Sequence, residues 1–212
     1  MRFIRAAALT ALVAVVLWVG MRRPAAPPGE LAPPTPRGPG RFVDHGDGSA
    51  TDTTTGLTWE LKVDGEDCLH CVDDKYTWSL GTNNPDGTAF TLFLDRMNNT
   101  CDGDDATRCV RDEQCTGIGN GLCGHTGLHD WRLPTEAELT TLLLEPFECP
   151  KNPCVDPSFP GVVKGHGYWT STPDRRKAGA ARGVFLSNAF AGSGPKIGGA
   201  YVRAVRGPTS SE

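Results

Sequence analysis

The sequence predicts an α+β domain behind an export segment, and three observations support this prediction. Short segments rich in β-branched and aromatic residues lie at both ends of the region 41–207, and two segments with helical spacing lie between them. Strands do not alternate with helices, which argues against a parallel sheet of βαβ units. All eight cysteines of the 212-residue chain follow residue 67, which is typical of a disulfide-stabilised exported protein.

The first 23 residues form the predicted export segment. Arg2 and Arg5 precede an apolar run from 6 to 21, and two further arginines close it. A run of this length fits a signal peptide, yet no clear cleavage site follows. Both a removed signal peptide and a retained N-terminal membrane anchor therefore stay open, which leaves periplasmic, inner-membrane-anchored and extracellular locations. The membrane is expected to be contacted only through this segment.

Residues 24–40 are proline-rich and predict a spacer. Proline disfavours both helix and sheet, so an extended polyproline II linker or a stub left after cleavage is expected. The domain itself is expected to span 41–207, followed by a short tail at 208–212. A region of this length is enough for one hydrophobic core.

The first part of the domain predicts a β-meander and a helix. In 41–61, apolar and β-branched residues flank Asp47-Gly48 and Thr55-Gly56, both typical of turns. In 88–99, apolar residues recur every three or four positions, and Thr88 is a suitable N-cap. Between 101 and 127, four cysteines and several glycines occur without hydrophobic periodicity, which predicts a loop insertion held by its own disulfides.

The stretch HDWRLPTEAEL, residues 129–139, predicts the start of a second helix. Thr135 and Glu138 form a capping-box pattern, in which each side chain accepts a hydrogen bond from the other residue's backbone N–H. Leucines then continue at helical spacing, so the helix is expected over about 136–144. These are structural duties, and they do not by themselves indicate a catalytic site.

Three aromatic or β-branched segments near the C-terminus predict strands, at 167–172, 181–188 and 200–207. In the last of these, period-2 alternation places Tyr201 and Val205 on one face and Val202 and Ala204 on the other.

The even cysteine count predicts disulfides, but the sequence does not fix their connectivity. Proximity alone favours Cys68 with Cys71 and Cys149 with Cys154. The middle four cysteines then allow three arrangements; they are Cys101, Cys109, Cys115 and Cys123.

Charge is unevenly distributed along the domain. Residues 41–163 contain eight Lys and Arg against 22 Asp and Glu, a net −14, whereas 164–212 contain eight against two, a net +6. An acidic domain is a poor partner for nucleic acid, whose binding requires phosphate neutralisation. The basic C-terminal residues are expected to be solvated or paired with the acidic part, and as the alternative they form an anion-binding surface. They are Lys164, Arg175, Arg176, Lys177, Arg182, Lys196, Arg203 and Arg206.

Calcium is the most plausible metal, because hard cations prefer oxygen ligands and the insertion is rich in carboxylates. The candidate ligands are Asp102, Asp104, Asp105, Asp112 and Glu113. The regular calcium-loop spacing is missing, so solvated turn carboxylates are the alternative, with no cofactor at all. Zinc would require free thiols at Cys68 and Cys71 together with His70 and either His125 or His129, and disulfide pairing competes with that arrangement.

No catalytic residue is predicted. The chain contains no nucleophile elbow, no phosphate-binding glycine loop and no H-E-x-x-H motif. His125, and His129 beside Asp130, are explained by turn hydrogen bonds before a capped helix. Trp131 and Trp169 are expected to fill the core rather than to stack on a sugar.

Four segments in order resemble the Lcl C-terminal domain family, named for a domain of a bacterial collagen-like adhesin. They are GDGSATDTTTGLTWE, HTGLHDWRLPTEAEL, YWTST and YVRAVRG. The resemblance implies a C-type-lectin-like α+β fold in which the first and last strands meet, displayed at the bacterial surface. It also implies attachment to polyanionic glycans, as in the namesake, and no enzymatic activity. This chain departs from the family pattern through its cysteine-rich insertion and the absence of a collagen-like repeat.

RLPTEAE is also similar to a segment of the formylglycine-generating enzyme family, whose other motifs are missing here. The sequence therefore predicts an exported, non-catalytic binding module of the envelope or medium, recognising a glycan or an envelope or extracellular protein. Its ligand surface is expected on the loops around the insertion, with the basic C-terminal residues as the second candidate. An oxidase related to the formylglycine-generating enzymes and a structural envelope protein that binds only proteins are the alternatives. The oligomeric state is not predicted.

Overall fold

The computed structural model describes residues 40–101, 104–109, 111–115, 121–144, 149 and 152–208. The export segment and nearly all of the proline-rich spacer lie outside this range. Within it, no helix is long and apolar enough to cross a membrane. The described part is α+β, with short antiparallel strands and few helical turns, as the sequence predicts.

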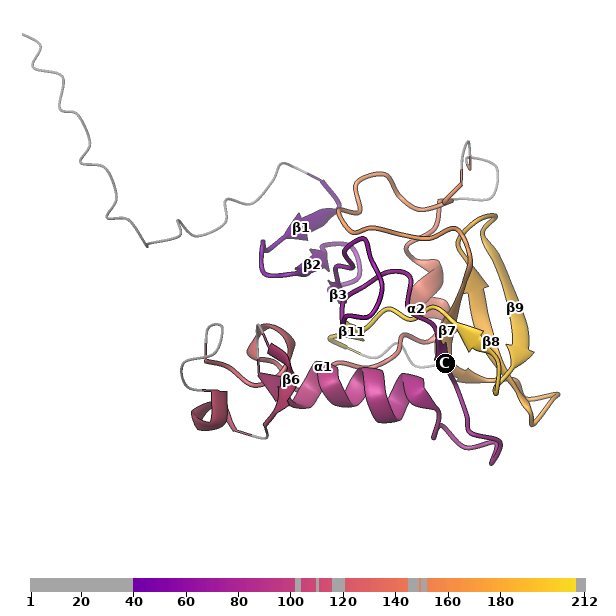
Figure 1. Cartoon of the computed structure of the whole chain (residues 1–212). Coiled ribbons are helices and arrows are strands. Elements are labelled where there is room, and N and C mark those ends of the chain that lie inside the picture. The colour runs from indigo at the N-terminus through magenta and orange to yellow at the C-terminus, as the bar shows by residue number, and fades with distance from the viewer. Residues whose placement is uncertain are drawn as a thin grey trace, which may run out of the picture. The chain divides into compact units, whose positions relative to one another are not determined.

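The first sheet joins the two ends of the domain. Its antiparallel strands follow the order β1-β2-β3-β11, and their bounds are Phe42–Asp44, Ser49–Asp52, Thr58–Glu60 and Val205–Arg206. Val205 lies opposite Trp59, so the last strand completes the meander that opens the domain. Figure 1 shows β11 beside β3, although the two are far apart in the sequence.

The second sheet is built from the C-terminal third of the domain. It follows the order β7-β8-β9, with bounds Gly167–Pro173, Ala180–Phe185 and Phe190–Pro195. β9 was not predicted, because its sequence FAGSGP lacks the β-branched residues and alternation that signal a strand. It forms through its register with β8, which pairs six residues in succession. Beside it, β4 (Tyr76–Thr77) and β10 (Gly199–Ala200) form a short ribbon.

The prediction of a single strand over 200–207 is wrong. The segment divides into β10 and β11, and residues 201–204 between them pass through the interior, all of them buried. The predicted alternation nevertheless holds, because Tyr201 and Val205 pack in one hydrophobic cluster and Val202 and Ala204 in the other. This segment therefore lies between the two halves of the core.

The first predicted helix forms over its expected length, and the second is shorter than predicted. The segment 88–99 forms a π-helical stretch at Ala89–Leu94 followed by α1 at Asp95–Asn99. Thr88 does not cap it with its side chain; its hydroxyl instead accepts a hydrogen bond from the Thr77 N–H at 2.9 Å. The helix predicted over 136–144 is α2, Glu136–Thr140, and it ends early because Leu143 forms a β-bridge with Val155.

The capping box forms as the sequence predicts. The Glu138 N–H donates to Thr135 Oγ1 at 3.2 Å, and the Thr135 N–H donates to Glu138 Oε2 at 2.8 Å. Glu138 also forms a bidentate ion pair with Arg132, whose Nη1 and Nη2 donate to Oε2 and Oε1 at 2.6 and 2.7 Å. The motif therefore attaches α2 to the segment that leads into it.

The cysteine-rich insertion is not wholly a loop. It contains β5 (Thr100–Cys101), β6 (Asp104–Arg108) and two 3-10 turns at Asp112–Cys115 and His125–Gly127. Disulfides join Cys68 to Cys71, Cys109 to Cys123 and Cys149 to Cys154, and Cys101 is also disulfide-bonded. The two local pairs that proximity favours are thus present, and the Cys109–Cys123 bond closes the insertion on itself.

Candidate functional site

A buried ionic cluster lies where the meander meets the turn at Cys68–Cys71, whose sequence is CLHC. Glu60, at the end of β3, has a fully buried side chain, and its Oε1 lies 2.8 Å from both Lys62 Nζ and His70 Nδ1. Burial by itself would raise the pKa of Glu60, but the Lys62 ammonium and the His70 ring outweigh it and hold that pKa far below its usual range. Burial lowers the pKa of Lys62, although Glu60 opposes the shift.

The remaining bonds of this cluster go to the backbone of neighbouring segments. Glu60 Oε2 accepts from the Ala204 N–H at 3.0 Å, and Arg203 Nη1 donates to the Glu60 carbonyl at 2.6 Å. Lys62 Nζ donates to the Leu69 carbonyl and lies 4.3 Å from the centre of the Phe93 ring. The carboxylate is thus surrounded by donors from this chain, as in a structural ion pair.

His125 packs against His70 of this cluster. Its ring centre lies 4.3 Å from that of His70, and its Nε2–H donates to the Gly48 carbonyl at 3.1 Å. Burial, with His70 as the next cause, lowers the pKa of His125 to about 4. His125 is therefore neutral at neutral pH.

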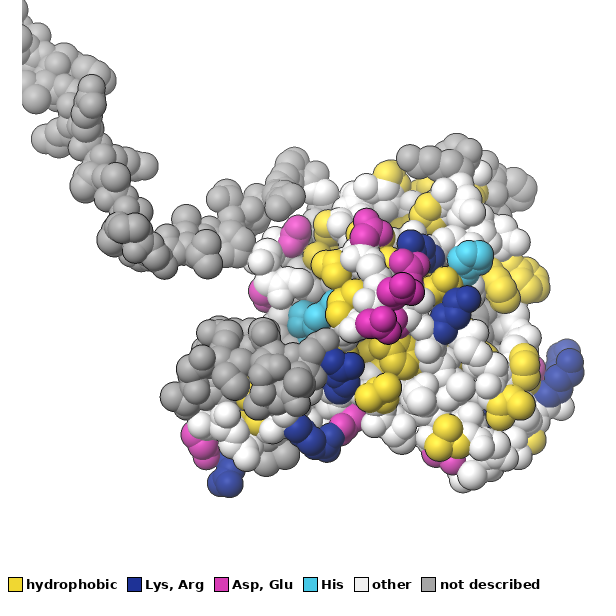
Figure 2. Space-filling view, viewed as in Figure 1, with side chains coloured by type: hydrophobic (Ala, Val, Ile, Leu, Met, Phe, Trp, Pro, Cys, Tyr) yellow, Lys and Arg dark blue, Asp and Glu magenta, His cyan; other side chains and the backbone are white. Residues whose placement is uncertain are grey.

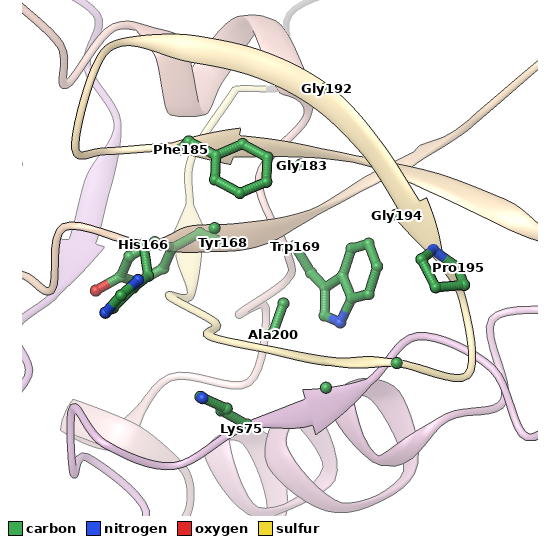
Figure 3. A pocket seen from close by; sticks show the side chains of 13 residues that line it. Lys75, His166, Tyr168, Trp169, Gly183, Phe185, Gly192, Gly194, Pro195 and Ala200 are labelled. Atoms are coloured by element: carbon green, nitrogen blue, oxygen red, sulfur yellow. The ribbon is translucent and has the colours of Figure 1, made fainter.

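A cavity that could hold a small ligand lies on the second sheet. It encloses about 360 Å³, within the range of small-molecule sites. Gly183 of β8 pairs with Gly192 of β9, and Gly194 follows two residues later on the same face. These three glycines leave the floor without side chains, as Figure 3 shows.

Aromatic rings form the walls of this cavity. In Figure 3 the Phe185 ring and the Trp169 indole stand on either side of the glycine floor. A Cβ at Gly194 would lie 3.2 Å from the Trp169 indole, and one at Gly167, which also lines the cavity, would lie 3.2 Å from the Phe185 ring. The glycines are therefore what allows the rings to approach the sheet. Trp169 is buried, as predicted, and also presents an edge to the cavity.

Two basic groups stand at the mouth of the cavity. Lys75 lies just before β4, and His166 just before β7; both are exposed and line the cavity. The Lys75 ammonium lies 5.2 Å from the centre of the Tyr201 ring, on which His166 stacks at 5.7 Å. No carboxylate is among the lining residues. The site thus offers an apolar floor, aromatic faces and hydrogen-bond donors at its entrance.

A second and more open hollow lies beside α2, with a volume of about 710 Å³. It is lined by Glu136 and Arg182, which pair with each other at 2.7 Å, and by the exposed Arg175 and Arg176. It lacks aromatic walls.

The predicted pairing of the basic C-terminal residues with the acidic part is partly present. Lys164 pairs with Asp73 at 3.0 Å, and Arg206 with Asp130 at 2.7 Å. Figure 2 shows Asp and Glu side chains near the middle of one face, next to Lys and Arg. Arg203 and Lys196 are buried instead.

The residues weighed for zinc or acid–base chemistry are held in other contacts. Cys68 and Cys71 are bonded to each other, and His129 Nδ1 donates to the Asn98 carbonyl at 2.7 Å. Among the described residues, no group of three His, Cys, Asp or Glu side chains has a metal-binding arrangement. Asp130 binds Arg206 rather than His129.

Most of the predicted calcium ligands lie outside the described part. Asp102 is not described, nor are the side chains of Asp104, Asp105 and Asp112. Glu113 is exposed and lies 3.5 Å from Arg111. Calcium binding in the insertion therefore stays a prediction.

The four sequence motifs that resemble the Lcl C-terminal domain family lie along the domain between the β1–β2 turn and β11. The sequence model of that family matches residues 48–206, which span the same elements. The chain belongs to the Lcl C-terminal domain family. No curated protein and no solved structure matches the chain.

The match places the cysteine-rich insertion and the cavity inside the Lcl C-terminal domain. The cavity was not predicted from the sequence. Its glycines are spread over four strands and the β9–β10 turn, and β9, which supplies two of them, was not predicted. The one available signal was the glycine-rich segment AFAGSGPKIGGA next to aromatic strands.

Proposed function

We propose that this protein is an exported, non-catalytic binding module of the bacterial envelope or medium, with a C-type-lectin-like fold, that recognises a glycan in adhesion. The observation that supports this proposal is the cavity between Phe185 and Trp169. Membership in a family named for an adhesin domain supports the adhesive role.

The cavity suits a sugar ring for physical reasons. A pyranose presents an apolar C–H face and a hydroxyl-bearing rim, so it requires aromatic surface and a few polar groups at the edge. Phe185 is 41% exposed and is available for such contact. Lys75 and His166 at the mouth supply donors for hydroxyl or carboxylate oxygens.

The contacts of three buried or paired titratable groups argue against a catalytic use of those groups. His125 donates to Gly48, His129 to Asn98, and Glu60 is enclosed by Lys62 and His70. None of these groups lines the cavity. A general acid or base has to reach the substrate.

The pairing of β11 with β3 supports the proposed fold, because the first and last strands of the domain meet in one sheet. The disulfides support export, because such bonds persist in oxidising compartments.

The test is a glycan array probed with the exported protein, followed by calorimetry on the glycans that bind. Gly199→Leu is the filling variant, because a Cβ at Gly199 meets only the Lys75 Cβ at an ordinary 3.4 Å and the longer side chain enters the cavity. We expect Gly199→Leu and Phe185→Ala to weaken binding at least tenfold, roughly 1.4 kcal/mol.

The matched control is Leu92→Ala, which removes another exposed apolar side chain, 45% exposed, outside the cavity. It is expected to bind as the wild type does. An array without any bound glycan, or equal affinity of wild type and Gly199→Leu, overturns the proposal.

A further inference from the structure

The outer strand of the second sheet has backbone groups that point away from the sheet. Beyond the Ala180–Pro195 pair, the Lys196 N–H donates to the Gly179 carbonyl at 2.9 Å. In an antiparallel ladder, residues whose backbone bonds the neighbour alternate with residues whose backbone points outward. The register therefore directs Phe190, Gly192 and Gly194 toward β8, and Ala191 and Ser193 away from it.

The other side of β8 gives the same assignment. The Leu186 N–H donates to the His166 carbonyl at 3.0 Å, one residue beyond the Gly167–Phe185 pair. Phe185 therefore does not exchange bonds with Gly167, and its own backbone groups face Phe190 of β9. Ala191 and Ser193 then keep their N–H and C=O groups on the outer edge.

This edge is protected only at its end, where Pro195 takes the outward position that follows Ser193. Proteins discourage strand addition with edge lysines, edge prolines, inward-pointing charges or a covering segment. β9, FAGSGP, carries no charged side chain, and among the described residues the strand has no partner on its outer side. In Figure 1 it is the outermost strand of its sheet. Its small residues also leave room for a second backbone.

The two ends of β9 differ in chemistry. At its start, Phe190 is 57% exposed, and its ring centre lies 6.2 Å from that of Phe185. At its end, Pro195 lies opposite Ala180, next to the β7–β8 loop with the exposed Arg175 and Arg176. The five steps between these ends span about 17 Å of extended chain.

We propose that the outer edge of β9 binds an extended acidic peptide segment of a partner protein by strand addition. The peptide backbone exchanges hydrogen bonds with Ala191 and Ser193. A bulky apolar side chain of the peptide packs on Phe190, which does not line the glycan cavity, and carboxylates about five residues away meet Arg175 and Arg176. Charge complementarity selects this occupant, because the loop at the end of β9 carries Arg175, Arg176 and Lys177 against one carboxylate, Asp174, which bonds the Ser193 side chain.

The test selects random twelve-residue peptides displayed on phage against the full exported protein, and then measures synthetic copies by fluorescence anisotropy. We expect the enriched peptides to combine an aromatic or aliphatic residue with acidic residues toward one end. Proline at an outward position removes an N–H without breaking a bond to β8. Ala191→Pro and Ser193→Pro are therefore each expected to weaken binding at least tenfold.

Matched controls keep the backbone N–H. Ala191→Val and Ser193→Ala are expected to bind as the wild type does, and circular dichroism is expected to show that all four variants are folded. Because two proline positions are tested, misfolding of one variant leaves the other as the test. Arg175→Glu with Arg176→Glu is expected to lower affinity and to reduce its dependence on salt.

Three results overturn the proposal: no enriched peptide, enriched peptides without acidic residues, or equal binding by the proline and control variants. Self-association that the proline variants abolish also overturns it, because the edge then pairs with a second copy. The outcome is separate from the glycan site, since Gly199→Leu is expected to keep peptide binding while losing the glycan.

Discussion

Lys62 Nζ lies 2.8 Å from Glu60 Oε1, and the two side chains are 2% and 0% exposed. An intact buried ion pair of this kind changes the free energy of unfolding little. Removal of one partner, however, leaves an uncompensated charge in the interior. Glu60 also binds His70 and the Ala204 N–H, so it connects the first sheet, the CLHC turn and the C-terminal segment.

We expect Glu60→Leu to lower the free energy of unfolding by about 3–5 kcal/mol, because Lys62 then remains buried without its partner. Urea denaturation followed by tryptophan fluorescence measures this. Glu113→Ala is the matched control, since its exposed pair with Arg111 has a separation of 3.5 Å, and we expect a change below about 0.5 kcal/mol. A loss below about 1 kcal/mol for Glu60→Leu contradicts the structural role of the pair.

Stability is expected to fall on acidification below about pH 6.5, because the pKa of His125 is lowered from 6.5 to about 4 in the folded protein. The unfolded chain takes up a proton at His125 in this window and the folded chain does not, so protons favour unfolding. The slope ends near pH 4, where the folded state also binds the proton. The free energy of unfolding that is lost across this pH window amounts to roughly 3 kcal/mol at most.

Urea titrations at half-unit steps of pH measure this dependence. The lowered pKa of Glu60 has the same sign, since that carboxylate stabilises the fold only while it is ionised. We expect His125→Gln to flatten the curve between pH 6.5 and 4. An unchanged slope in His125→Gln contradicts the assignment.

Thr135→Ala is expected to cost about 1 kcal/mol of stability, because the Glu138 N–H loses its acceptor at the start of α2. Thr140→Ala, at the other end of the same helix, removes a hydroxyl that only donates back to the Ala137 carbonyl. Its effect is expected to be within about 0.5 kcal/mol. Equal losses in the two variants would show that the capping box contributes nothing specific.

All eight cysteines are expected to be oxidised in the exported protein. Reduction should therefore raise the intact mass by about 8 Da, one hydrogen for each thiol formed. Alkylation under denaturing, non-reducing conditions should label none of them. The same mass measurement distinguishes a removed signal peptide from a retained anchor, and a labelled cysteine would support the thiol chemistry of the oxidase alternative.

Local chemistry explains the elements that were predicted correctly. The capping box, the two glycine-containing turns of the opening meander and the strands β7 and β8 are specified by residues within a few positions of one another. Short-range hydrogen bonding and side-chain alternation determine such elements, so they are readable from one sequence. The alternation of residues 201–205 between two hydrophobic clusters is also of this kind.

The errors arise where distant residues decide the structure. β9 exists because Gly192 and Gly194 pair with residues of β8, and not because glycine favours a strand. The helix predicted over 136–144 ends at Thr140 because the backbone of Leu143 forms a β-bridge with Val155 instead of continuing the helix. The C-terminal segment divides in two because β4 and β3 each take one end of it.

The sequence by itself predicted an export segment, which stays a prediction. It determined the α+β class, the capped helix and the family, because each of these depends on local patterns or on motifs in order. Only the tertiary structure decided which groups meet. It joined Glu60, Lys62 and His70 in one buried cluster, and it placed Phe185 and Trp169 on either side of a glycine floor. The reason is that both arrangements depend on strand register and chain crossing, which local periodicity does not encode.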